Sequence, residues 1–242
     1  MVRELQTGGR VEAQGGAMRI RTTLFIFGIT ALTFTGCSGT ASPAPGQPTT
    51  VEDRPSSAAA SVCGASAAEA ENMLTTAPTN RWELVGAIAA TAENSDSGPF
   101  VVKENGERYC FVRTAYGALG AAVGYTALVS TSDRELLSRL IPLVIAPGVG
   151  RDAALTSPGD LANPALGAPQ VVAFAIDEYD ADFALVDIVW RDAAQGDALV
   201  SAPTSLQWIE GDWKIVLNDR AQPPSPSIVI DDLEGHIPWS AN

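Results

Sequence analysis

Few side chains in this sequence have both the type and the spacing that a reaction needs. The chain contains three cysteines, Cys37, Cys63 and Cys110, and a single histidine, His236. Two isolated cysteines and a distant histidine cannot complete a four-ligand zinc site without carboxylates. The sequence has neither the Gly-x-Ser-x-Gly motif of serine hydrolases nor a glycine-rich phosphate loop. We therefore expect no catalytic residue, no metal and no cofactor, and we expect that the protein is not an enzyme.

Asp187 is the strongest candidate for general acid–base catalysis. It alternates with Leu185 and Val189 in a strand-like run, so its side chain is a candidate to point into the protein. Burial there would favour the protonated form of a carboxyl group, as a general acid requires. The structural alternative is that Asp187 pairs with Arg191 on the same strand face or lies in solvent. We favour this alternative, because ion pairs commonly explain such groups.

Two further groups of polar residues are interpreted as surface features. His236 lies beside Gly235 in a proline-rich tail, where a lone histidine is usually exposed. An acidic cluster precedes the strand of Asp187, and its spacing does not match an EF-hand calcium loop. We expect a solvated turn there, formed by Asp177, Glu178, Asp180 and Asp182.

The N-terminus is typical of an export signal. Residues 24–34 are apolar and uncharged but too short to span a membrane, which takes about 20 residues. Arg19 and Arg21 precede them, as in the basic region of a signal peptide. Met18 begins a more typical signal than Met1 does. We therefore expect residues 1–36 to be an N-terminal extension followed by a signal peptide.

The signal ends at Phe34-Thr35-Gly36-Cys37, which resembles the lipobox of bacterial lipoproteins. Thr35 and Gly36 fit the small positions of that motif, whereas Phe34 departs from its usual leucine. The resemblance implies that the Cys37 thiol carries a fatty acyl chain such as palmitate and that Cys37 is the first mature residue. The alternatives are an ordinary signal peptide or a buried cysteine. Lipidation predicts a protein anchored to the cell membrane and facing its extracytoplasmic side.

Residues 37–61 are rich in Pro, Ser, Thr, Ala and Gly and offer almost nothing to bury. Such a composition predicts a disordered, lipid-anchored linker with a root-mean-square reach of roughly 25–30 Å.

The part of the chain that follows the signal is strongly acidic. The whole chain has 15 basic and 28 acidic residues, and residues 1–36 hold four Arg and two Glu, so 11 basic and 26 acidic residues remain from Cys37 onward. This surplus of negative charge repels nucleic acids and anionic lipids, so we expect no nucleic-acid partner and membrane contact through the anchor alone.

With Cys37 acylated, Cys63 and Cys110 form an even pair. An even pair in an oxidising compartment predicts a disulfide. This bond would staple the start of the domain to its body and would stabilise it by roughly 4 kcal/mol in the chain-entropy model.

From residue 62 to residue 242 the pattern predicts one extracytoplasmic α+β domain, in which helices precede an antiparallel meander. We expect the C-terminal tail, with a short extended run at 228–230, to wrap over this domain. Residues 157–169 are predicted to be loop. The predicted strands are 81–89, 100–103, 107–113, 170–179, 183–191, 200–209 and 212–218, and the predicted helices are 117–129, 133–145 and 149–156.

The run from Phe183 to Arg191, followed by residues 203–217, resembles the closing hairpin of nuclear-transport-factor-2-like domains. In that fold, helices pack on a curved antiparallel sheet to form a cone. Short motifs such as Gly98-Pro99 and Trp213-Lys214 also resemble uncharacterised actinobacterial lipoproteins, often encoded near conjugative elements. These resemblances imply a cone fold, but the fold hosts enzymes and binding modules alike.

Three functions follow as hypotheses. The first is a non-enzymatic interaction or scaffold module of a cell-envelope assembly, with a conjugation apparatus as one candidate and its protein partner unknown. The second is a lipoprotein that binds a small apolar ligand in the cone cavity. The third, an isomerase or hydratase, requires Asp187 inside a pocket.

Overall fold

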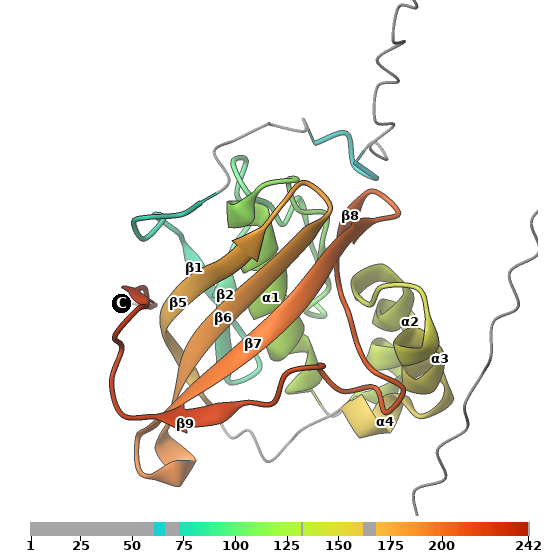
Figure 1. Ribbon diagram of the computed structural model, residues 1–242. Helices are drawn as coiled ribbons and strands as arrows, with labels where there is room; N and C mark the ends of the chain where they lie inside the picture. The colour runs from blue at the N-terminus through green and yellow to red at the C-terminus, as the bar shows by residue number, and fades with distance from the viewer. Residues whose placement is uncertain (1–60, 66–72, 132, 162–167, 242) are drawn as a thin grey trace, which may run out of the picture. The chain divides into compact units, whose positions relative to one another are not determined.

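A six-stranded antiparallel sheet forms the centre of the domain (Figure 1). The computed structural model describes residues 61–65, 73–131, 133–161 and 168–241, so the leader, Cys37 and nearly all of the linker lie outside the described residues. The strand order is β10-β5-β6-β7-β8, and β9 pairs with the early residues of β7. The strands are β5 Gln170–Tyr179, β6 Phe183–Asp192, β7 Ala198–Ile209, β8 Asp212–Ile215, β9 Ile228–Ile230 and β10 Ile237–Pro238.

The two faces of this sheet differ, because side chains alternate along each strand. On β6, Ala184, Val186, Ile188 and Trp190 belong to the main hydrophobic core, and Asp187 therefore lies on the opposite face. Two register shifts in β5, the first between Val171 and Ala173, interrupt its ladder with β6. Such bulges bend a strand and increase its twist.

Helix α1, Ala115–Val129, packs on the core face of the sheet (Figure 1). It begins where the Thr114 side chain accepts a hydrogen bond from the Gly117 backbone N–H, at 3.0 Å, which satisfies one of the free donors at a helix start. Alanine and glycine dominate its sequence, so its backbone approaches the neighbouring elements closely. The predicted helix at 117–129 is therefore present and begins two residues earlier.

Three shorter helices lie to one side of α1 (Figure 1). Asp133, the first residue of the predicted helix 133–145, caps the first of them by accepting a hydrogen bond from the Leu136 N–H. Residues 157–169 are not entirely loop, because a one-turn helix begins directly after Ser157. The helices are α2 Arg134–Val144, α3 Val149–Thr156 and α4 Pro158–Leu161.

Two small hairpins precede α1. The single strand predicted at 81–89 is wrong: the chain turns at Gly86 and forms β1 Trp82–Val85 and β2 Ile88–Thr91. Gly86 has a φ of +61°, a conformation that glycine adopts without steric cost. The strands predicted at 100–103 and 107–113 are present but shorter, and they form a hairpin of β3 Val101–Val102 and β4 Arg108–Tyr109.

The C-terminal segment crosses the sheet from one edge to the other. Because β9 pairs with β7 and β10 pairs with β5, residues 231–236 pass over β6 between them. Trp239 then fixes the end of the segment, with its ring 4.7 Å from Trp82 and 5.4 Å from Phe174 between centroids. The predicted wrapping of the tail is thus present, and the architecture is α+β. In the part of the chain that the structure describes, no helix combines the length and apolar character needed to cross a bilayer.

Candidate functional site

The linker joins the domain next to the pair Cys63 and Cys110. Cys63 and Cys110 lie at disulfide distance, with 6.2 Å between their Cα atoms, which is the pairing that the sequence predicted. The Val62 N–H also donates to the Gly211 carbonyl at 3.1 Å. Figure 1 shows residues 61–65 beside the β7–β8 turn. The point where the linker joins the domain is therefore held from two sides.

A buried carboxylate, Asp212, reinforces the same place. Its Oδ2 accepts from the Cys110 N–H at 2.6 Å, and its Oδ1 accepts from the N–H groups of Phe111 and Trp213, each at 2.8 Å. Burial raises the pKa of Asp212 to about 6, while the three backbone donors and Lys214 act in the opposite direction. Asp212 therefore ties the β7–β8 hairpin to the segment that carries Cys110. The sequence indicated the hairpin but not this role.

Lys214 links the same hairpin to the short helices. Its buried Nζ donates to the Pro142 carbonyl near the end of α2, at 2.9 Å, and pairs with Glu210 at 2.8 Å. A cation at this place complements the negative end of the helix dipole. Arg151 and Lys214 together lower the pKa of Glu210 to about 2, so this network of ion pairs persists well below neutral pH.

Asp187 lies at the centre of a second polar cluster, beneath the C-terminal segment. Its Oδ2 accepts from the Ser201 hydroxyl at 2.6 Å and lies 3.0 Å from His236 Nε2. Its Oδ1 is buried without a hydrogen-bond partner among the described residues. The side chains of His236 and Asp187 are only 14% and 9% exposed. The interpretation of Asp187 as paired with Arg191 or exposed to solvent is therefore wrong, and Asp187 does not face α1 either. The interpretation of His236 as a free surface residue is also wrong.

The geometry of this cluster shows which groups touch. His236 Nδ1 lies 3.1 Å from the Glu234 carbonyl, which can only accept a hydrogen bond. The other ring nitrogen, Nε2, lies against Asp187 Oδ2. The Asp187 carboxylate, not the imidazole, contacts Ser201. The histidine therefore cannot take the serine proton directly, and the cluster differs from a nucleophilic triad.

We expect the His236–Asp187 contact to fasten the C-terminal segment. His236→Ala should lower the free energy of unfolding by about 2–3 kcal/mol, because it leaves a buried carboxylate with the Ser201 hydroxyl alone. The same substitution in an Asp187→Ala background should cost at least 1 kcal/mol less, roughly the coupling of contacting residues. Denaturant unfolding of the four proteins of this cycle measures both quantities. Additive effects would show that the two side chains act independently.

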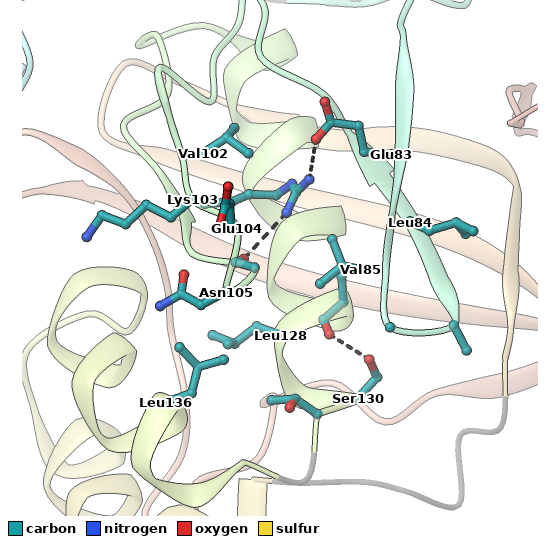
Figure 2. A pocket seen from close by; sticks show the side chains of 16 residues that line it. Glu83, Leu84, Val85, Val102, Lys103, Glu104, Asn105, Leu128, Ser130 and Leu136 are labelled. Atoms are coloured by element: carbon teal, nitrogen blue, oxygen red, sulfur yellow. Dashed lines mark hydrogen bonds and ion pairs between the residues drawn. The ribbon is translucent and has the colours of Figure 1, made fainter.

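A first cleft of about 530 Å³ opens where the β1–β2 and β3–β4 turns meet the facing ends of α1 and α2 (Figure 2). Leu128 and Leu136 come from the two helices and belong to one small hydrophobic cluster. Arg108 donates to Glu83 at 2.6 Å across the cleft wall. Leu84 is 75% exposed at the rim. The cleft thus combines an apolar floor with a charged wall.

A second cleft of about 390 Å³ lies between α1 and the core face of the sheet. Trp190, Val200 and Ala202 line it from β6 and β7, and Tyr125 lines it from α1. Asp187 and His236 line neither cleft. Asp187 is therefore not placed to act as an acid or base in either of these two clefts.

The carboxylates of the acidic turn between β5 and β6 form hydrogen bonds and an ion pair that stabilise the turn. Asp180 Oδ1 accepts from the backbone N–H groups of Asp182 and Phe183, at 2.7 and 2.8 Å, and Asp182 forms an ion pair with Arg113. The residues that the structure describes contain no group of three or more His, Cys, Asp or Glu that is arranged to hold a metal ion.

Comparison with known proteins gives a family. Residues 41–238 match the family model described as Domain of unknown function (DUF8175). The chain belongs to this family. The part of the chain that matches DUF8175 takes in the sheet, both clefts and the C-terminal segment with His236. No match was found among curated proteins or among solved structures.

Proposed function

We propose that this protein is a lipoprotein anchored to the cell membrane through Cys37, whose domain faces the extracytoplasmic side as a non-enzymatic interaction module of an envelope assembly. This localisation is supported by the signal-like leader, by the cysteine that ends it and by the linker that follows. The fold proposed for the domain is a nuclear-transport-factor-2-like cone, which agrees with a bulged antiparallel sheet packed on one long helix. A conjugation apparatus is one assembly that such a module would serve.

The placement of the entry point relative to the clefts carries the proposal. Cys110 and Asp212 hold the entry point near the first turn of α1, because Val112, two residues beyond Cys110, contacts Gly117. Both clefts are lined by residues of the last turns of α1, between Tyr125 and Leu128. Fifteen helical residues extend about 22 Å. The linker would therefore join the domain at the end opposite the clefts and would leave them uncovered.

Metabolic labelling with an alkyne analogue of palmitate tests the anchor. The wild-type chain should take up the label and sediment with membranes, whereas Cys37→Ser should stay unlabelled. The control is the double variant Cys63→Ser/Cys110→Ser, which loses the other two thiols and should still be labelled. An unlabelled wild-type chain, or a labelled Cys37→Ser variant, would contradict the anchor.

Site-specific photocrosslinking tests the interaction role. A photoreactive amino acid at Leu84, on the rim of the first cleft, should give one adduct of defined mass in native membranes, and mass spectrometry identifies its partner. The same amino acid at Asp219, which is exposed and lines neither cleft, is the control. Identical background patterns from the two positions would contradict an interaction surface at this cleft.

A further inference from the structure

The second cleft has the shape of a ligand site. It lies between α1 and the core face of the sheet, and β9 and Pro223 contribute to its wall. Its volume of about 390 Å³ falls within the range of small-molecule pockets, about 300–1,000 Å³. The Trp190 indole and the Val200 and Ala202 side chains provide an apolar surface. Ile228 and Val229 extend that surface to the rim, where they are 55% and 65% exposed.

One buried side chain in this cleft carries a hydroxyl without a partner. Tyr125 is only 8% exposed, and its hydroxyl makes no hydrogen bond with the residues that the structure describes. Burial raises the pKa of Tyr125 above its ordinary value, so the phenol keeps its proton and remains a donor. The hydroxyl oxygen is not among the fully enclosed side-chain atoms that lack a partner, so it is open to the cleft as a free donor. A ligand in the cleft that supplies an acceptor would pair with it.

Four other polar side chains of the lining are already engaged, whereas Ser227 is exposed. Asp192 Oδ1 accepts from the Ala194 N–H at 2.9 Å and its Oδ2 accepts from Gln195 Nε2 at 2.6 Å. The hydroxyls of Thr126 and Thr204 donate to carbonyls of their own segments. None of the described residues that line the cleft is Lys, Arg or His. An anionic ligand would therefore meet a carboxylate and no cation.

We infer that this cleft binds a neutral, largely apolar small molecule whose carbonyl oxygen accepts a hydrogen bond from the Tyr125 hydroxyl. The ligand's hydrocarbon body covers Trp190 and Val200, and its far end lies against Ile228 and Val229. This inference goes beyond the interaction role and does not depend on lipidation.

The test uses a fluorescent naphthyl ketone, 6-propionyl-2-(dimethylamino)naphthalene, which is neutral and apolar and emits at longer wavelength when its carbonyl is hydrogen-bonded. The protein is the chain from residue 37 onward with Cys37→Ser, which needs no detergent and contains every described residue. We expect saturable binding of one dye per chain, with energy transfer from tryptophan to the dye. Tyr125→Phe should weaken binding about tenfold, as the loss of one hydrogen bond predicts, and should shift the emission of the bound dye to shorter wavelength.

Two further variants separate this site from non-specific adsorption. Ala202→Leu fills the cleft and should abolish saturable binding, whereas Tyr116→Phe should leave binding unchanged, because Tyr116 lines neither cleft and its hydroxyl is paired with Asn94 and Thr79. The 2-naphthoate anion should bind more weakly than the ketone. Absence of saturable binding by the parent chain, or an unchanged affinity and emission in Tyr125→Phe, would overturn the inference.

Discussion

Asp212→Ala lowers the free energy of unfolding at pH 7 by about 3–5 kcal/mol, as expected for the removal of a buried, fully bonded charge. The substitution leaves the N–H groups of Cys110, Phe111 and Trp213 without their acceptor. It also removes two of the hydrogen bonds that join the β7–β8 hairpin to the segment that carries Cys110. Denaturant unfolding followed by tryptophan fluorescence measures the change.

Asp219→Ala is the matched control for this prediction. Asp219 is exposed, so its removal should change the free energy of unfolding by no more than about 0.5 kcal/mol. Equal effects of the two substitutions would show that the three hydrogen bonds of Asp212 contribute no more than a surface charge does.

The same carboxyl group gives the unfolding free energy a pH dependence. The pKa of Asp212 is about 6 in the folded protein and about 3.9 in an unfolded chain. Between these values the folded state binds more protons, so this contribution to stability falls as the pH rises from about 4 to about 6. Asp212→Asn does not titrate. The difference in unfolding free energy between wild type and this variant should therefore shrink by roughly 2–3 kcal/mol from pH 4 to about pH 7 and stay constant above that. Parallel pH curves would contradict the raised pKa.

Two glycines of α1 should respond in opposite ways to alanine. A Cβ atom at Gly117 would lie 1.9 Å from the Val112 carbonyl oxygen, so the helix would have to move away from that segment and weaken the cap formed by Thr114. We expect Gly117→Ala to lower the free energy of unfolding by about 3–4 kcal/mol, the sum of overpacking and the loss of a cap. Thermal and denaturant unfolding measure this loss.

Gly124→Ala is the control in the same helix. Its Cβ would meet only Phe111 Cζ, at an ordinary contact distance of 3.7 Å. Because alanine loses less backbone entropy than glycine in a helix, this variant should be more stable by about 0.5–1 kcal/mol. If both variants were destabilised alike, the close approach at Gly117 would not be the cause.

Local patterns predicted much of the secondary structure. The predicted ranges 170–179, 183–191 and 200–209 match the long strands β5, β6 and β7 to within two residues, and the predicted helix 133–145 matches α2 to within one. Between β7 and β8 the chain turns at Glu210 and Gly211, which both have positive φ, +55° and +78°. The same reasoning failed at 81–89, because an alternating pattern does not show that a chain reverses at Gly86.

The sequence by itself indicated the α+β class and the long strands and helices, because these depend on composition and on short-range periodicity, and the count of cysteines indicated the pairing of Cys63 with Cys110. Only the tertiary structure decided that Asp187 meets His236, that Asp212 clamps three backbone N–H groups, and that the Tyr125 hydroxyl stays unpaired in a cleft. The first two of these contacts join residues 49 and about 100 positions apart. The sheet face on which a side chain lies, and the segment that covers it, depend on strand register and on the path of the C-terminal segment. No local pattern encodes either of them, since both arise from the packing of distant parts of the chain.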